Sequence, residues 1–128
     1  MREIILNNEV PNTGTFLYNL KYHNILKKSH FKKYLQEIVL SFIEIKDEYE
    51  MKDFIYIIFN QYSFINWCII STLNKTNPYK FKKPTNYKND NKLILLLERF
   101  REIIKLIING DKEGIMNYED ELGKIFND

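Results

Sequence analysis

The chain has 128 residues, enough for one domain (1–128) but too few for two independent cores. Its 45% hydrophobic and 28% charged residues are typical of a globular protein and exclude a disordered one. Aromatic residues are abundant and glycines are scarce, which favours helices over a turn-rich β fold.

The first third of the chain predicts a lead-in followed by two helices. Residues 3–14 are expected to form a short helical or irregular lead-in that ends at the turn signal PNTG (11–14). Thr15 is expected to cap a helix that carries Phe16, Leu17, Leu20 and Ile25 or Leu26. Ser29 is expected to cap a strongly amphipathic helix, whose apolar residues recur every three or four positions: Phe31, Tyr34, Leu35, Ile38, Val39, Phe42 and Ile45.

The middle of the chain predicts a long central helix. A boundary lies within residues 44–53, where either Asp47 or Asp53 is expected to be the cap. The helical period then continues through Met51, Phe54, Ile55, Ile58, Tyr62, Ile65, Ile69 and Leu73. A break near Ser63 is left open.

Residues 75–90 are predicted to be the one long non-helical stretch, because Pro78 and Pro84 interrupt any helix there. Asp90 or Asn91 is expected to cap the next helix, which Gly110 ends. Asp111 is expected to cap a last amphipathic helix that carries Ile115, Tyr118, Leu122, Ile125 and Phe126. The fold class predicted is all-α, a single irregular bundle of five or six helices with one long basic loop.

Charge is segregated along the chain although the net charge is only +2. The stretches 21–33 and 75–92 are rich in lysine, whereas residues 44–53 and the last helix are rich in Asp and Glu. Such polarity suits fast, oriented encounter with a partner of one sign. The alternative is that each stretch is simply a solvated helix face, and acids early in a helix also complement its dipole.

No catalytic, cofactor or metal signature is visible. His23 and His30 are too far apart for one metal and are expected to lie on different helices. Cys68 follows Trp67 on the most apolar helix, where a small core residue is expected rather than a nucleophile. The acids Glu48 and Glu50, and those from Glu119 to Glu121, are expected to lie on solvent-exposed faces rather than to form metal sites. We therefore expect a protein that is not an enzyme and needs no cofactor or small-molecule ligand.

The single cysteine forms no internal disulfide, and the apolar run at the N-terminus is too short for a signal-peptide core. A cytoplasmic location is therefore expected. Residues 54–74 carry no charge and are long enough to span a bilayer, but Asn60, Gln61, Ser63 and Asn66 in their centre would find no partner in lipid. A buried helix is the favoured interpretation, and no membrane contact is expected.

The basic loop offers a second alternative. Its lysines alternate with Tyr79, Phe81 and Tyr87, a combination that suits single-stranded nucleic acid; the lysines in question are Lys80, Lys82, Lys83 and Lys88. The small net charge and the acidic stretches oppose binding of a polyanion, so direct nucleic-acid binding is not the favoured hypothesis. The same aromatic residues suit protein recognition equally well.

From its opening MREIILNNEVPNTGTF to its closing NYEDELGKIFND, the chain resembles an enterobacterial immunity protein of the contact-dependent growth inhibition type (CdiI). The resemblance covers the whole chain and includes its Ile, Lys and Asn bias, but it rests on no motif. It implies a protein that neutralises the C-terminal toxin domain of a cognate CdiA exoprotein. Many such toxins are nucleases, and the resemblance implies a tRNA-cleaving toxin as the partner of this chain.

A nuclease presents a cationic surface to its substrate, so an inhibitor gains by offering carboxylates in place of phosphates. The sequence places these carboxylates in residues 44–53 and in the last helix. The predicted toxin-binding residues are Glu44, Asp47, Glu48, Glu50, Asp53, Asp111, Glu113, Glu119, Asp120 and Glu121. Occlusion of the toxin's active cleft is the expected mode of action.

Overall fold

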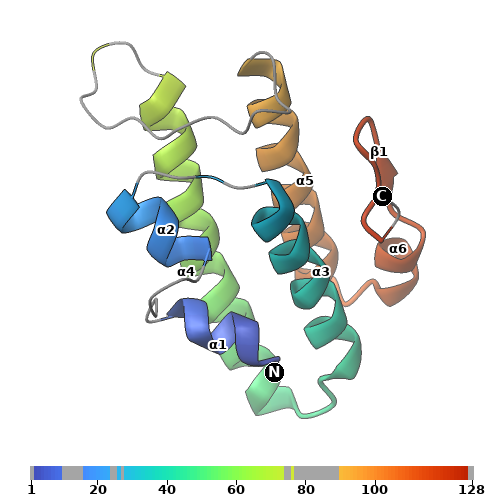
Figure 1. Ribbon diagram of the computed structural model, residues 1–128. Coiled ribbons are helices and arrows are strands. Elements are labelled where there is room, and N and C mark those ends of the chain that lie inside the picture. Colours follow the sequence, from blue (N-terminus) through green and yellow to red (C-terminus); the bar gives the residue numbers. More distant parts are fainter. Residues whose placement is uncertain are drawn as a thin grey trace.

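The computed structural model describes residues 2–9, 16–23, 26, 28–73, 76 and 90–126. Within these ranges the chain forms six helices and one short antiparallel hairpin, so the all-α prediction is confirmed (Figure 1). The elements are α1 (Glu3–Glu9), α2 (Phe16–His23), α3 (Lys28–Glu44), α4 (Glu48–Leu73), α5 (Asp90–Ile108), α6 (Lys112–Met116), β1 (Glu119–Asp120) and β2 (Gly123–Lys124).

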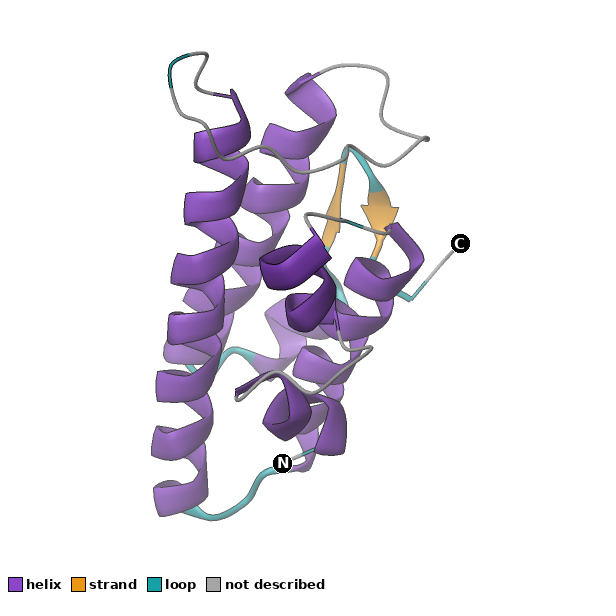
Figure 2. Cartoon of the chain, turned by 60° about the vertical axis from the view of Figure 1, so that its left-hand side comes forward, coloured by secondary structure: helices purple, strands orange, loops and turns teal. Residues whose placement is uncertain are grey.

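The long helices α4 and α5 pack against each other, and α3 lies beside α5 (Figure 1). The short helix α1 contacts both α3 and α4, while α2 joins α1 and α3. Helix α6 packs on α3 and α5, so the C-terminal segment lies on the opposite edge of the bundle from α4 (Figures 1 and 2). Apolar side chains from all six helices and from Ile125 share one core.

Helix α4 runs without a break over 26 residues. Asp47 is its N-terminal cap, because its Oδ2 accepts a hydrogen bond of 2.9 Å from the Glu50 N–H, whereas Asp53 lies inside the helix. Ser63 turns its hydroxyl back onto the Phe59 carbonyl at 3.0 Å, which satisfies this polar group without interrupting the helix. The boundary that the sequence left open is thus at Asp47, and the break considered near Ser63 is absent.

Of three other predicted helix caps, two are wrong and one is confirmed. Helix α3 begins at Lys28, so Ser29 lies inside it and the cap predicted there is wrong. Asp111 caps α6 as predicted, with its Oδ1 accepting from the Gly114 N–H at 2.7 Å. Helix α5 begins at Asp90, so Asp90 and Asn91 both lie inside it and the cap predicted at one of them is wrong. The predicted cap at Thr15, the turn at 11–14, Ile25, and the basic loop apart from Thr76 and Asp90 lie outside the described residues.

The last predicted helix is wrong beyond Met116. The chain turns at Asn117 and forms the β1–β2 hairpin, with Gly123 at a φ of 95° that favours glycine. Ile115 and Ile125 are nonetheless buried, and Tyr118 and Leu122 pack against the core. The apolar spacing therefore identified the inward-facing residues correctly but not the backbone that carries them.

The described part of the lead-in is the helix α1, the first of the two predicted alternatives, and it contributes to the core. Ile5 of α1 is fully buried, and the Ile5 carbonyl accepts a hydrogen bond of 3.0 Å from Gln61 Nε2 of α4. The Gln61 Oε1 in turn accepts from the buried Tyr34 hydroxyl of α3, whose pKa burial raises well above its ordinary value. One amide thus connects three helices.

Polar contacts at the N-terminus hold α1 from its other side. The Arg2 guanidinium pairs with the buried Glu37 and, at 2.8 Å, with Glu44. Burial alone would raise the pKa of Glu37, but hydrogen bonds from Lys33 and Arg2 hold it below its ordinary value. Of the predicted toxin-binding residues, Glu44 is therefore partly engaged inside the fold.

Replacing Gln61 with alanine should release α1 from the bundle. The change leaves the Tyr34 hydroxyl and the Ile5 carbonyl buried without their partner, at a cost of about 2 kcal/mol in the free energy of unfolding. Hydrogen exchange should accelerate in residues 3–9 more than in α5. Uniform acceleration across all helices would contradict the view that Gln61 acts as a local clamp on α1.

Candidate protein-binding surfaces

The ten carboxylates predicted to bind a toxin fall into two groups in the structure. Several of them form ion pairs or helix caps within the fold. Glu44 pairs with Arg2, Asp120 pairs with Arg99, and Asp47 and Asp111 cap helices. The half-buried Glu50 also has an interaction of its own. The remaining five are exposed and have no ion pair or side-chain hydrogen bond to another described residue: Glu48, Asp53, Glu113, Glu119 and Glu121.

These five exposed carboxylates lie on two separate surfaces. Glu48 and Asp53 stand on the first turns of α4, at the end of the bundle where α3 turns into α4; we call this the corner surface. Glu113, Glu119 and Glu121 stand on α6 and the hairpin, along the edge of the bundle; we call this the C-terminal surface (Figure 1). The sequence predicted both acidic groups, but the fold keeps them as distinct candidates.

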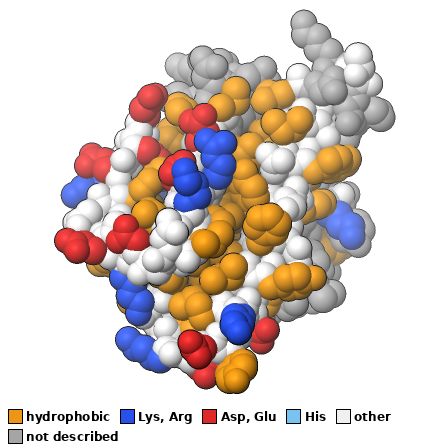
Figure 3. Space-filling view, turned by 180° about the vertical axis from the view of Figure 1, so that it is seen from behind, with side chains coloured by type: hydrophobic (Ala, Val, Ile, Leu, Met, Phe, Trp, Pro, Cys, Tyr) orange, Lys and Arg blue, Asp and Glu red, His pale blue; other side chains and the backbone are white. Residues whose placement is uncertain are grey.

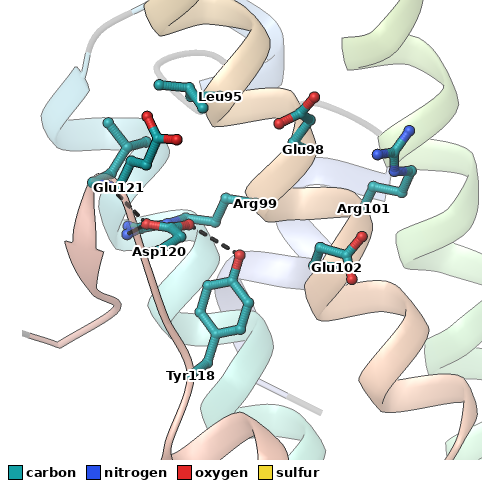
Figure 4. A pocket seen from close by; sticks show the side chains of 9 residues that line it. Leu95, Glu98, Arg99, Arg101, Glu102, Tyr118, Asp120 and Glu121 are labelled. Carbon is teal, nitrogen blue, oxygen red and sulfur yellow. Dashed lines mark hydrogen bonds and ion pairs between the residues drawn. The ribbon is translucent and has the colours of Figure 1, made fainter.

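The C-terminal surface is fixed to the bundle by Arg99. This side chain is almost entirely buried, and its Nε donates to Asp120 Oδ2 at 2.8 Å (Figure 4). Its Nη2 donates to the other carboxylate oxygen and, at 2.6 Å, to the Gly123 carbonyl. The two hydrogen bonds to Asp120 form a bidentate pair, the geometry that arginine provides best. Together with the bond to Gly123, they let one guanidinium hold both strands of the hairpin against α5.

Asp120 accepts hydrogen bonds from two further groups beside that ion pair. The Leu122 N–H donates to it at 2.8 Å, and the Tyr118 hydroxyl donates at 3.0 Å (Figure 4). Partial burial would raise the pKa of Asp120, but the hydrogen bonds from Arg99, Leu122 and Tyr118 hold it below its ordinary value. Burial and the hydrogen bond to Asp120 both raise the pKa of Tyr118. Asp120 is therefore a structural residue rather than an accessible interface charge.

The sequence contained a signal for this arrangement that the prediction missed. Arg99 lies between Leu96 and Ile103 on the buried stripe of α5, three residues after one and four before the other. A cation on an apolar stripe requires a carboxylate partner from elsewhere in the chain. Which carboxylate supplies it depends on the hairpin, which the helical prediction for residues 117–126 did not include.

A shallow pocket of about 330 Å³ lies beside the ion pair. It is lined by Glu98, Arg101 and Glu102 of α5 together with Tyr118 and Glu121 from the C-terminal segment (Figure 4). Arg99 also lines it, but its guanidinium is already occupied by Asp120 and Gly123. The pocket walls carry both signs of charge, so they offer no selective site for an ion of one sign.

The outer face of α4 is a third surface, and the sequence did not predict it. Its inward face is buried as expected, through Phe54, Ile58, Ile65 and Ile69. The opposite face is also apolar and is exposed: Tyr49, Tyr56, Phe59, Trp67 and Ile70. The absence of charge over residues 54–74 predicts a helix buried as a whole, and the exposed outer face corrects that prediction.

Helix α4 is also the one described helix that is long and apolar enough to cross a membrane, judged by length and composition. Of its most apolar window, 44% is buried inside the fold. A core helix of a folded domain passes the same test. The apolar residues of α4 thus fall into two sets: one packs in the core, and the other lies exposed on the outer face of the helix.

The remaining chemical groups form no site among the described residues. Cys68 is buried in the core, as expected. His23 ends α2 and His30 belongs to α3, so the two histidines lie on different helices, also as expected. Within the described ranges no three His, Cys, Asp or Glu side chains come together as metal ligands would.

Comparison with known proteins identifies no relative. No protein-family model matches this sequence. No curated protein and no solved structure matches it either. The chemistry of the surfaces described above therefore carries the functional argument.

Proposed function

We propose that this protein is a non-enzymatic inhibitor that binds the cationic active cleft of a nuclease toxin, in the manner of an immunity protein for a CdiA C-terminal toxin domain. The observation that carries the proposal is the C-terminal surface. It presents Glu113, Glu119 and Glu121 to solvent on a segment that the Arg99–Asp120 pair fixes in place.

Rigid presentation of carboxylates favours tight binding. An interface group that is already ordered loses little conformational entropy on binding, so more of the contact energy appears as affinity. The hairpin has only two residues in each strand and would be marginal alone, but Arg99 ties both strands to α5. Glu119 and Glu121 flank the anchored Asp120, so their positions follow from that anchor.

Apolar anchors lie close to these acids in the chain. Met116 and Phe126 are among the exposed large hydrophobic residues, and both belong to the same C-terminal segment. Effective neutralisation of a toxin requires about −14 kcal/mol of binding free energy, which interfaces of about 1,600 Å² reach when a few side chains are buried at their centre. Exposed acids together with an exposed Met and Phe supply the polar and apolar groups that such an interface needs.

The direct test uses the toxin domain that this proposal expects to be encoded immediately upstream of the gene for this chain. Purified protein is added to that domain with tRNA as substrate, and cleavage should stop at a nearly equimolar ratio. An engineered variant of the toxin with a disabled active site should still form a complex of stable size. Undiminished cleavage in a large excess of this protein would refute the proposal.

Charge reversal distinguishes the two acidic surfaces. The double variant Glu119→Lys/Glu121→Lys should lower the association rate for the toxin about 10- to 100-fold at low salt, with a smaller effect at high salt, because steering by exposed charges is screened. Asp120 is left intact so that the hairpin stays folded. Stopped-flow fluorescence at several salt concentrations measures the rate.

The matched control is Glu48→Lys/Asp53→Lys, which changes the net charge equally but on the corner surface. Its association rate should stay close to that of the unmodified protein. If the control slows association and the C-terminal variant does not, the toxin binds at the corner surface. Equal effects of both variants would indicate a response to net charge rather than to a defined interface.

A further inference from the structure

The exposed residues on the outer face of α4 follow the spacing of a helix-pairing stripe. Tyr49, Tyr56, Ser63 and Ile70 are seven residues apart, and Phe59 and Trp67 lie between them on the same side. Positions repeated every seven residues with intermediate positions three or four away form the seam by which one helix packs along another. The stripe covers most of the length of α4.

The large side chains of this stripe are each more than half exposed. Tyr56 is 69% exposed, Phe59 53%, Trp67 51% and Ile70 52%, although each is a large apolar or aromatic side chain. In Figure 2, α4 forms one edge of the molecule, with no described helix over its outer side. Figure 3 shows hydrophobic side chains gathered along the middle of the back face, with one group of charged side chains among them and the other charged side chains toward the rim. Contiguous apolar surface of this kind marks an interaction site.

We infer that the outer face of α4 binds the same face of a second copy of this chain, as an antiparallel helix pair with its two-fold axis at Ser63. This interaction is separate from the proposed toxin binding, which uses the opposite edge of the bundle. The result is a symmetric dimer whose two C-terminal surfaces remain exposed.

The residue positions agree with this axis. A two-fold axis at Ser63 places Phe59 against Trp67 of the second copy, because each lies four residues from Ser63. It also places Tyr56 against Ile70 of the second copy, because each lies seven residues away. Every large residue in the centre of the stripe thus meets another large residue. The small Ser63 side chain lies at the crossing, where two helix backbones approach each other most closely.

Charge selects the antiparallel arrangement and the second copy as the occupant. The described side chains of α4 beyond Asp53 carry no charge, so two copies meet there without repulsion. Glu48, Glu50 and Asp53 lie at one end of α4. An antiparallel pair keeps the acids of the two copies apart, whereas a parallel pair brings them together. An anionic lipid surface suits the stripe less well, since acids lie beside it and Lys52 is the single lysine on α4.

The available area is sufficient for a specific dimer. An aromatic side chain has roughly 150–250 Å² of surface, so the four large residues that this register pairs offer about 400 Å² per copy. Two copies together would bury about 800 Å² from these side chains, and Asn60, Ser63 and Asn66 raise the total toward about 1,000 Å². Specific interfaces begin at about this size, and the aromatic content matches the residues that dominate binding energy.

Two measurements test the dimer and its register. Sedimentation equilibrium over a range of concentrations should show a mass that rises from one copy to two. The variant Phe59→Glu/Trp67→Glu should remain a single copy at all of these concentrations, with an unchanged helical circular dichroism spectrum. The variant Ser63→Cys should form a disulfide-linked dimer in mild oxidant, because the two cysteines would face each other at the axis.

The controls use residues that lie away from the stripe. Ser29→Cys, another exposed serine on α3, should cross-link far more slowly, and the unmodified protein with its buried Cys68 should not cross-link. A single-copy mass at every concentration would overturn the inference. So would equal cross-linking of Ser29→Cys and Ser63→Cys. Flotation of a single-copy protein with lipid vesicles, lost in Phe59→Glu/Trp67→Glu, would assign the stripe to a membrane surface instead.

Discussion

Replacing Phe100 with alanine is expected to lower the free energy of unfolding by about 4 kcal/mol. The ring is fully buried, and it packs edge-on against Phe31, Tyr34 and Tyr62 at centroid distances of 6.1, 5.8 and 5.4 Å. Its removal leaves a cavity where α3, α4 and α5 meet, and these helices cannot close it without moving apart. Urea denaturation measures the loss.

A domain of this size has a total stability of about 5–15 kcal/mol, so Phe100→Ala should bring it close to the limit of folding. Phe126→Ala is the matched control, because Phe126 is 47% exposed on the C-terminal segment. That variant should lose less than about 1 kcal/mol. Similar losses in both variants would mean that Phe100 is not at the centre of the core.

Asp120→Ala is expected to cost about 3 kcal/mol, because it leaves the buried Arg99 guanidinium without its carboxylate. The Arg99 side chain is only 6% exposed, so water cannot replace the lost partner effectively. The hairpin should detach before the bundle unfolds, since Asp120 and Gly123 are its points of attachment to Arg99. Chemical shifts of residues 117–126, compared with those of α4, would show this local loss.

The same ion pair predicts a dependence of stability on acid. The folded-state pKa of Asp120 lies below its ordinary value of 3.8. The stabilisation is therefore fully present above that ordinary pKa and is lost as the pH falls through the lowered value. Unmodified protein should lose more stability than Asp120→Asn between about pH 5 and pH 2. Glu121→Gln, a change at the exposed neighbouring carboxylate, should instead follow the unmodified protein.

The structure also changes which carboxylates belong in a binding experiment. Charge reversal across residues 119–121 would disrupt the Arg99 pair together with any interface, so a loss of binding would have two explanations. Reversal at Glu119 and Glu121 alone avoids this ambiguity. The equivalent separation at the corner is between Asp47, which caps α4, and the exposed Glu48 and Asp53.

Apolar periodicity in the sequence determined the helical class of the fold and most of its core. Positions such as Phe31, Ile38 and Ile58 recur at helical spacing, and each of them is buried in the structure. Local chemistry was sufficient at Asp111 and Gly110 too, where a cap and a positive φ depend on neighbouring backbone alone. Ile115 and Ile125 show the limit of the method, because helical spacing located them in the core although they are not on one helix.

Tertiary structure decided which charges and rings are available to a partner. Asp120 and Glu121 are neighbours in the sequence, yet one pairs with Arg99, 21 positions earlier, and the other faces solvent. Large apolar residues occur on both faces of α4, and one of these faces is covered where α1 and α5 pack against the helix. In each case the physical reason is the same. Exposure and ion pairing depend on groups that are distant in the chain, and the spacing of residues within one segment does not show which distant groups will pack against it.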